Sequence, residues 1–265
     1  MKKTIKWLLV VITTYLLILF STYLFQEKLI FHPTKLAQDY RHNFPNAFEE
    51  VFLENTDGGI VNALHFKRES PKGILLYFHG NRGNLKRWAK AMQFFVDLNY
   101  DVFVMDYRTY GKSTGLLSEQ ALYSDAEMCY TYLTKHYEES DIILYGRSLG
   151  TGLATYVASK NHPRHLILEA PYYSLKEVAI QRFPLFPVSS MLKYEFPLYK
   201  FMQKVNCPIT IFHGTNDQVI PYESATKLVR SKDQNKPFLV TVEKGTHHKL
   251  NESNTYLLQI KKILN

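Results

Sequence analysis

The chain has only two cysteines, Cys129 and Cys207, among its 265 residues. That is too few for a disulfide framework or a cysteine-rich zinc site. The ten histidines include no His-Glu-x-x-His sequence, so the sequence does not favour a metalloenzyme. An internal repeat and a low-complexity tract are also lacking. These absences leave an ordinary globular domain, for which a hydrophobic content of 46% supplies an ample core.

Positive charge is in excess but is nowhere concentrated. The formal net charge is +8, yet the sequence has no block of lysine and arginine and no basic helix with interleaved aromatic residues. We therefore expect no nucleic-acid partner. A basic solvated surface accounts for this charge, and anionic lipid headgroups are the better candidate partner because of the N-terminal segment described next.

One long apolar run lies near the N-terminus. No charged residue occurs from Trp7 to Phe25, close to the ~20 residues that a helix needs to cross the hydrocarbon core of a bilayer. A cleaved signal peptide is the alternative, but its apolar region would be shorter and would end in small residues. Here the run ends in the bulky sequence Tyr23–Phe31. We predict an uncleaved membrane anchor over residues 1–25, with the lipid bilayer as a partner through residues 7–25.

Basic residues on the two sides of this run indicate its orientation. The short N-terminal side carries three lysines, Lys2, Lys3 and Lys6. By the positive-inside rule, this end lies in the cytoplasm and the rest of the chain faces outward, into the periplasm or its equivalent. An opposing signal comes from three basic residues on the far side of the run, Lys28, Lys35 and Arg41.

The remaining chain predicts an α/β domain. Residues 26–47 are typical of a juxtamembrane linker, and the domain is expected over residues 48–265. Its first two strands are joined by the hairpin signal Asp57-Gly58, and strands then alternate with helices. The expected strands are Phe48–Glu54, Ile60–Phe66, Gly73–Phe78, Tyr100–Asp106, Asp141–Tyr145, His165–Glu169, Ile209–His213 and Phe238–Val242. The expected helices are Leu85–Leu98, Ser118–Tyr137, 151–159 and Leu257–Leu264. This order predicts a mostly parallel sheet with helices on both faces, and chemistry at the carboxyl ends of the strands.

A candidate nucleophile lies in the sequence Gly146-Arg147-Ser148-Leu149-Gly150. A short β-branched strand precedes it and a helix of small residues follows it. Strand, Gly-x-Ser-x-Gly and helix make up the nucleophile elbow, in which Ser148 occupies a strained turn and glycines prevent a clash. The alternative is an ordinary strand-to-helix turn with a capping serine, because this short motif also occurs by chance.

A serine nucleophile needs a base, and the base needs an acid to hold it. In this order of elements, the acid and the histidine should follow later strands. Asp217 lies in the loop after the strand at Ile209–His213, and His247 lies in the loop after Phe238–Val242. Taken alone, Asp217 could be a solvated turn residue and His247 a loop histidine without a task. Their joint order along the chain favours a catalytic triad.

An oxyanion hole would complete the site with two backbone N–H groups. One belongs to Leu149, the residue after the nucleophile. The other is expected from Asn81, in the glycine-rich loop His79-Gly80-Asn81 after an earlier strand. An ordinary strand-to-helix loop is the alternative there, and His79 is expected to orient the loop rather than to react.

These motifs together resemble the α/β-hydrolases, in particular the N-terminally anchored ABHD-type serine hydrolases and their bacterial serine aminopeptidase-like relatives. The resemblance covers roughly residues 73–250 and rests on the segments Tyr77–Asn81, Asp106–Ser113, Gly146–Gly150, Glu169–Pro171, His213–Asp217 with Ile220-Pro221, and Gly245–His247. It implies an α/β-hydrolase fold with Ser148 as nucleophile, Asp217 as acid, His247 as base, and Asn81 and Leu149 as oxyanion donors. It implies neither a metal nor an organic cofactor.

The sequence departs from these relatives at two positions. They usually carry glycine where this chain has Thr109, in a loop near the pocket. They usually have a single histidine followed by asparagine, whereas His247 is here followed by His248. His247 keeps the spacing from the preceding strand, and His248 remains a competitor for the role of base.

An insertion at about residues 172–207 indicates the substrate. In this fold it would form a small helical cap over the pocket, and its many Phe, Leu, Met and Tyr side chains favour an apolar, acyl-sized pocket. These side chains could equally pack the cap onto the sheet. With the membrane anchor, they favour lipid-like esters or thioesters as substrates. A serine peptidase would need acidic residues near the cap, for which Glu177 and Glu195 are candidates. A non-catalytic, membrane-tethered scaffold on the same fold is the remaining alternative.

Overall fold

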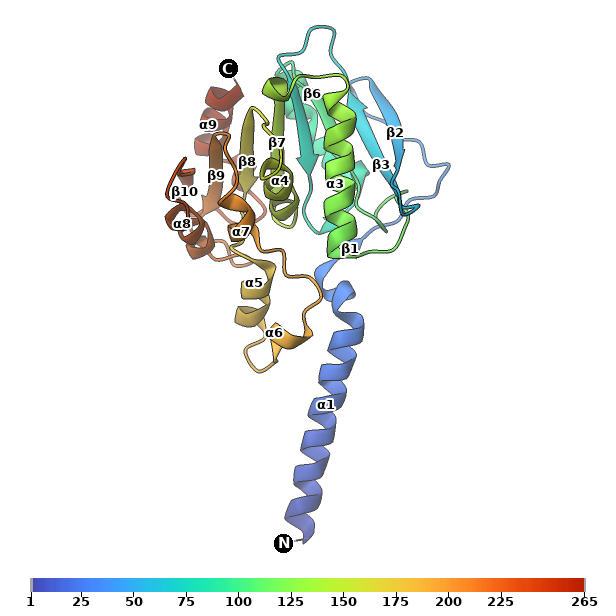
Figure 1. Ribbon diagram of the computed structural model, residues 1–265, viewed down its shortest axis with the longest axis vertical. Helices are drawn as coiled ribbons and strands as arrows, with labels where there is room; N and C mark the ends of the chain where they lie inside the picture. Colours follow the sequence, from blue (N-terminus) through green and yellow to red (C-terminus); the bar gives the residue numbers. More distant parts are fainter. Residues whose placement is uncertain (1, 265) are drawn as a thin grey trace.

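The computed structural model describes residues 2–264 (Figure 1). Within these residues, one sheet of eight strands forms the centre of the molecule. In spatial order its strands are β10 (Phe238–Val242), β9 (Ile209–Gly214), β8 (His165–Glu169), β7 (Ile142–Arg147), β4 (Ile74–Phe78), β6 (Asp101–Met105), β3 (Ile60–Phe66) and β2 (Phe48–Glu54). The strands from β10 to β6 are parallel to their neighbours, whereas β3 and β2 run antiparallel. The predicted mostly parallel α/β sheet is therefore confirmed.

The hairpin at the start of the sheet forms where its turn residues predict it. β2 and β3 pair from Phe48 with Phe66 to Glu54 with Ile60. In the turn, Gly58 has φ 79°, a left-handed conformation that glycine adopts without strain. The carboxylate of Asp57 accepts a hydrogen bond from the Gly59 N–H at 3.1 Å. The Asp-Gly signal was thus a reliable guide to this turn.

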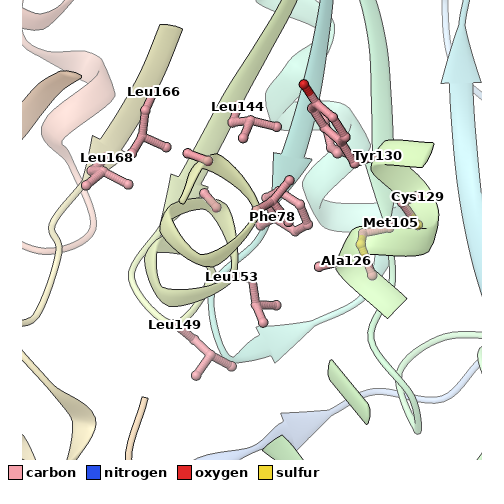
Figure 2. Packing of buried hydrophobic residues seen from close by; sticks show 14 of the residues in the cluster. Phe78, Met105, Ala126, Cys129, Tyr130, Leu144, Leu149, Leu153, Leu166 and Leu168 are labelled. Atoms are coloured by element: carbon pink, nitrogen blue, oxygen red, sulfur yellow. The ribbon is translucent and has the colours of Figure 1, made fainter. Parts of the chain in front are cut away.

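Helices cover both faces of the sheet, because its central strands are apolar on both sides. In β4, Ile74, Leu76 and Phe78 pack into one core cluster, whereas Leu75 and Tyr77 pack into the other. Helices α3 (Glu119–Thr134), α4 (Gly150–Ala158) and α8 (Tyr222–Ser231) contribute to the first cluster, part of which is shown in Figure 2. Helices α2 (Leu85–Asp97) and α9 (Asn254–Leu264) contribute to the second. The sequence order thus produces a layer of helices on each face.

Local sequence determines where these helices begin. The Ser118 side chain accepts a hydrogen bond from the Ala121 N–H at 3.0 Å and caps α3, as its position in the sequence suggested. The Asn84 side chain caps α2 in the same way through the Lys86 N–H. The end of α3 was predicted less accurately than its start, because this helix ends at Thr134 and the sequence predicted Tyr137.

One helix projects away from the body of the protein (Figure 1). Helix α1 (Lys2–Ile30) contains a stretch that is long and apolar enough to cross a membrane, and none of that stretch is buried. The chain then turns back along the domain, where Phe31 is only 3% exposed. Strand β1 (His32–Pro33) pairs in parallel with β5 (Arg82–Gly83), which lies in the loop after β4. Residues 26–30 of the segment expected to be a linker thus continue α1, and residues 32–33 are bonded to the domain.

The insertion after β8 forms a small helical cap. It contains α5 (Leu175–Arg182), α6 (Val188–Met191) and α7 (Leu198–Met202). Buried residues of α7 join the core cluster that α4 also contacts, so this part of the cap is attached to the sheet layer. Figure 1 shows α5 and α6 lower down, next to the end of α1. The cap thus lies between the sheet and the projecting helix.

Candidate active site

Ser148 lies in a strained turn between β7 and α4. Its φ of 50° is left-handed, which is costly for a residue with a side chain. A side chain on Gly146 would lie 2.6 Å from the Gly150 carbonyl oxygen, and one on Gly150 would meet the Phe78 backbone. Both glycines of the elbow are therefore required by close backbone packing. The turn is held in place by a hydrogen bond from the Ser148 N–H to the Glu169 carbonyl at 2.9 Å.

Three side chains from separate loops meet at this turn. His247 Nε2 lies 3.1 Å from Ser148 Oγ, and His247 Nδ1 lies 2.7 Å from Asp217 Oδ2. The histidine comes from the loop after β10 and the aspartate from the loop after β9, at the same edge of the sheet as the end of β7. A serine, a histidine and an aspartate are thus connected by hydrogen bonds, the arrangement that a nucleophile, its base and an orienting acid require.

Asp217 is held as a charged carboxylate. Its Oδ1 accepts hydrogen bonds from the N–H groups of Val219 at 2.8 Å and Ile220 at 2.9 Å. Burial would by itself raise the pKa of Asp217, but the contacts with His213 and His247 and the Ile220 N–H outweigh it and hold this pKa well below its usual range. A carboxylate that stays ionised can orient the imidazole and stabilise its positive charge.

The two neighbouring histidines differ in their surroundings. His247 is 7% exposed and makes the hydrogen bonds to Ser148 and Asp217. His248 is exposed, and its ring stands nearly perpendicular to that of His247, with 5.3 Å between the ring centroids. Of the two histidines, His247 is thus the one within hydrogen-bonding distance of Ser148 and Asp217.

The loop after β4 lies against the nucleophile. A methyl group on Gly80 would lie 3.7 Å from Ser148 Cβ, so the loop passes directly beside it. Within residues 2–264, the backbone N–H groups of Asn81 and Leu149 donate to no other protein group. Two free N–H groups next to a nucleophile are what an oxyanion hole requires.

His79 is buried behind this loop and braces it. Its Nδ1 faces the Gly80 carbonyl at 2.6 Å, and its Nε2 faces Asp106 Oδ1 at 3.1 Å. The Gly80 carbonyl and the Asp106 carboxylate are both acceptors. For both contacts to be hydrogen bonds, one proton must lie between the ring and each of these oxygen atoms. The ring also stacks on Trp88, with an angle of 9° between the planes. His79 therefore supports the loop from within the core and does not reach the reacting atoms.

Asn81 is fixed by the end of the projecting helix, a connection that sequence reasoning missed. Its side-chain Nδ2 donates to the Ile30 carbonyl at 2.7 Å. Its own carbonyl accepts hydrogen bonds from the His32 N–H at 2.9 Å and the Tyr110 hydroxyl at 2.6 Å. The main chain of Asn81 is thus held from both sides. No sequence pattern could have indicated this, because Ile30 is 51 residues away along the chain.

Arg147 is a second residue that the sequence did not assign. It is 7% exposed and donates from Nη2 to the His247 carbonyl at 3.1 Å, while its Nε lies 3.5 Å from Glu169 Oε1. Its guanidinium also lies over the Trp88 ring, 5.3 Å from the centroid. The residue next to the nucleophile therefore positions the loop that carries the base. The arginine in Gly-Arg-Ser-Leu-Gly was the available signal for such a role.

Candidate metal ligands do not gather at this site or elsewhere in the described residues 2–264, which contain no cluster of three or more His, Cys, Asp or Glu side chains able to hold an ion. The two acidic residues of the cap are engaged by lysines: Glu195 Oε1 lies 2.9 Å from Lys176 Nζ, and Glu177 pairs with Lys227. The side chains that meet at this site are thus a serine, a histidine and an aspartate, next to free backbone N–H groups.

Comparison with known proteins identifies the family of this chain. The serine aminopeptidase S33 family model matches residues 69–200. The chain belongs to the α/β-hydrolases, within the branch that includes the ABHD-type proteins. It is therefore a hydrolase of the esterase- and lipase-like type.

Particular relatives support this assignment. Protein bem46 of Schizosaccharomyces pombe is 31% identical over 74% of this chain and 71% of its own length. The lysophosphatidylserine lipase ABHD12 of Danio rerio is 28% identical over 63% of this chain and 49% of its own length. Among solved structures, the Pyrococcus furiosus esterase Pf2001 superposes with a TM-score of 0.71 at 14% identity, covering 89% of this chain and 96% of that one. The predicted family and fold are confirmed.

Proposed function

We propose that this protein is a membrane-anchored serine hydrolase that cleaves ester or thioester bonds of lipid-like acyl substrates. The observation that carries the proposal is the hydrogen-bonded series Ser148, His247 and Asp217 at the carboxyl edge of a parallel sheet. This arrangement supports nucleophilic catalysis by the serine.

The reaction would proceed in two steps. As Ser148 Oγ attacks the carbonyl carbon, His247 Nε2 takes the hydroxyl proton, and Asp217 stabilises the resulting imidazolium. The backbone N–H groups of Asn81 and Leu149 would donate to the oxyanion. The alcohol or thiol leaves with the proton from His247. A water molecule, deprotonated by the same histidine, then attacks the acyl-enzyme and releases the acid.

The cap and the anchor support an acyl substrate. The groove between α1 and the cap has almost only apolar side chains in its lining. One relative is described as a lysophosphatidylserine lipase, which is consistent with a lipid ester. A serine peptidase receives less support, because Glu177 and Glu195, the acidic residues of the cap, each already form an ion pair with a lysine.

Helix α1 would hold the enzyme in the membrane. Its length and apolar composition support a single membrane-spanning segment, and the three lysines in its first two turns favour a cytoplasmic N-terminus with the hydrolase domain outside. Protease accessibility in intact cells tests this orientation: the domain should be cleaved from outside without lysis. Protection of the domain until the cells are opened would reverse it.

A fluorophosphonate probe tests the catalytic proposal. The full chain in detergent or vesicles should be labelled, and Ser148→Ala should lose the label together with the hydrolysis of acyl esters. Ser70→Ala, a change at an exposed serine in a surface loop, is the matched control and should keep both. Absence of labelling in well-folded wild-type protein would favour the alternative hypothesis, a non-catalytic scaffold on the same fold. Cleavage of peptides in preference to esters would overturn the substrate class.

A further inference from the structure

The cap carries an apolar segment whose tip is exposed in the described part of the chain. From Phe183 to Leu192 no residue is charged, and the segment is flanked by Arg182 and Lys193. At its tip, Leu185 is 81% exposed. Exposed apolar side chains gathered at one tip indicate an apolar partner, because burying them from water is favourable.

The position of this segment along α1 identifies that partner. The Tyr15 hydroxyl donates to the Leu185 carbonyl at 2.6 Å, so the tip of the cap lies beside the middle of the uncharged run of α1. With a rise of ~1.5 Å per residue, Tyr15 lies about 15 Å along the helix from Phe25, where the run ends. The hydrocarbon core of a bilayer is about 30 Å thick. When α1 spans a membrane, Leu185 therefore lies deep within the hydrocarbon. Figure 1 shows the loop before α6 extending alongside α1, away from the sheet.

The backbone of the segment is suited to an environment without water, in which every polar group needs a partner. Pro184 and Pro187 have no N–H group to satisfy. The N–H of Phe183 donates to the Ala179 carbonyl at 2.9 Å, and the N–H of Phe186 donates to the Phe183 carbonyl at 3.0 Å. The Leu185 carbonyl is paired with Tyr15, as described above. The turn thus satisfies most of its backbone groups by itself or through α1.

Polar and basic side chains mark the level at which the segment would leave the hydrocarbon. Lys193 Nζ lies 4.6 Å from the centroid of the Tyr23 ring, and Lys28 Nζ lies 5.2 Å from that of Phe25. Tyrosine and lysine are common at the headgroup level of a membrane. At the same level, the Gln26 side chain accepts from the Lys193 N–H at 2.7 Å, and its amide donates to the Met191 carbonyl at 3.1 Å.

We propose that residues 183–192 are a second membrane-embedded element, which enters the leaflet nearer the hydrolase domain beside α1 and contacts the hydrocarbon core of the lipid bilayer. The facing surfaces of the cap and α1 enclose an apolar groove of about 80 Å³, to which Ile30, Phe183, Phe186 and Met191 contribute. This proposal rests on α1 spanning the membrane, which is part of the proposed function, but it is independent of the catalytic residues.

Depth-dependent fluorescence quenching tests the proposal on the full chain. The variants Leu185→Cys, Leu16→Cys and Leu258→Cys are labelled with an environment-sensitive thiol fluorophore and placed in phosphatidylcholine–phosphatidylglycerol vesicles. All three leucines are exposed, at 81%, 56% and 63% respectively. Leu258 is the matched control, because Figure 1 shows α9 at the far end of the molecule from α1. Wild-type protein, treated with the fluorophore in parallel, measures any background labelling of the native Cys129 and Cys207. Both are buried, so this background should be low.

We expect the labels at positions 185 and 16 to be quenched most strongly by lipids that carry a nitroxide deep in the acyl chain. The label at position 258 should be quenched by iodide in the water instead. Deep quenching at position 16 with iodide quenching at position 185 would overturn the embedded segment while leaving the anchor intact. Iodide quenching at both positions would overturn the segment and the anchor together. Thermal unfolding of each labelled variant, within a few degrees of wild type, verifies that it is folded.

Discussion

Replacement of Asp217 by asparagine should remove most of the turnover and leave the fold intact. Oδ1 of Asp217 accepts two backbone hydrogen bonds, from Val219 at 2.8 Å and Ile220 at 2.9 Å, while Oδ2 faces His247 Nδ1 at 2.7 Å. An asparagine keeps the two backbone bonds only if its oxygen takes the Oδ1 position, because its nitrogen can only donate. Its NH₂ group must then face the histidine.

This arrangement reverses the tautomer of the base. His247 would accept at Nδ1 and carry its proton on Nε2, the atom that lies 3.1 Å from Ser148 Oγ. A protonated Nε2 cannot take the serine proton. The wrong tautomer in a Ser-His-Asp triad lowers kcat by about 10⁴, which corresponds to roughly 5 kcal/mol of transition-state stabilisation.

The assay compares kcat for a chromogenic acyl ester, and the rate of fluorophosphonate labelling, between wild type and Asp217→Asn. The control is Asp233→Asn, which removes the same charge from an exposed position and should leave kcat unchanged. Thermal unfolding shows whether the variant is folded. If folded Asp217→Asn kept kcat within about tenfold of wild type, Asp217 would not be the acid that orients His247.

Two further predictions concern stability. Thr109 has φ 73°, a left-handed conformation that costs a β-branched residue about 1–2 kcal/mol. Thr109→Gly should therefore raise the free energy of unfolding. The gain should be about 1 kcal/mol, because the greater freedom of glycine in the unfolded chain offsets part of the relieved strain. A lower urea midpoint in the variant than in wild type would refute this. Burial lowers the pKa of His65 from 6.5 to about 4, so below pH 6.5 the unfolded chain binds the proton before the folded one does. Stability should then fall from about pH 6.5 to about pH 4 by at most roughly 3 kcal/mol from this group. The loss, measured by thermal unfolding, should be smaller in His65→Gln, and an equal pH dependence in both proteins would contradict it.

The arrangement of Ser148, Asp217 and His247 could be predicted because each follows a strand. In a parallel sheet, strand ends share one edge, so the order of strands along the chain is enough to bring their following loops together. The same reasoning predicted that the loop containing Asn81, which follows β4, lies at this edge of the sheet. The order of the strands could therefore be predicted from the pattern of apolar and turn residues, and with it the edge of the sheet at which these loops meet.

Other parts of the site depend on contacts that no local pattern encodes. Arg147 donates to the backbone of a residue 100 positions later in the chain, and the acceptor is a carbonyl that every residue has. The pairing of β1 with β5 involves only two residues in each strand, too few for a detectable alternation. Thr109 is the reverse case: the resemblance implies glycine at this position, and the left-handed φ of 73° is one that glycine adopts without strain.

The hydrogen bond from the Asn81 side chain to the Ile30 carbonyl joins α1, the proposed membrane anchor, directly to the proposed oxyanion loop. A helix whose apolar run exceeds the local bilayer thickness tilts, and one that is too short deforms the lipid around it. A tilt would act on the end of α1, which is bonded to the main chain of the proposed oxyanion loop. With α1 spanning the membrane and Asn81 donating to the oxyanion, as proposed, the thickness of the bilayer becomes a variable of the reaction, and the intrinsic rate should differ between thin and thick membranes at equal substrate concentration.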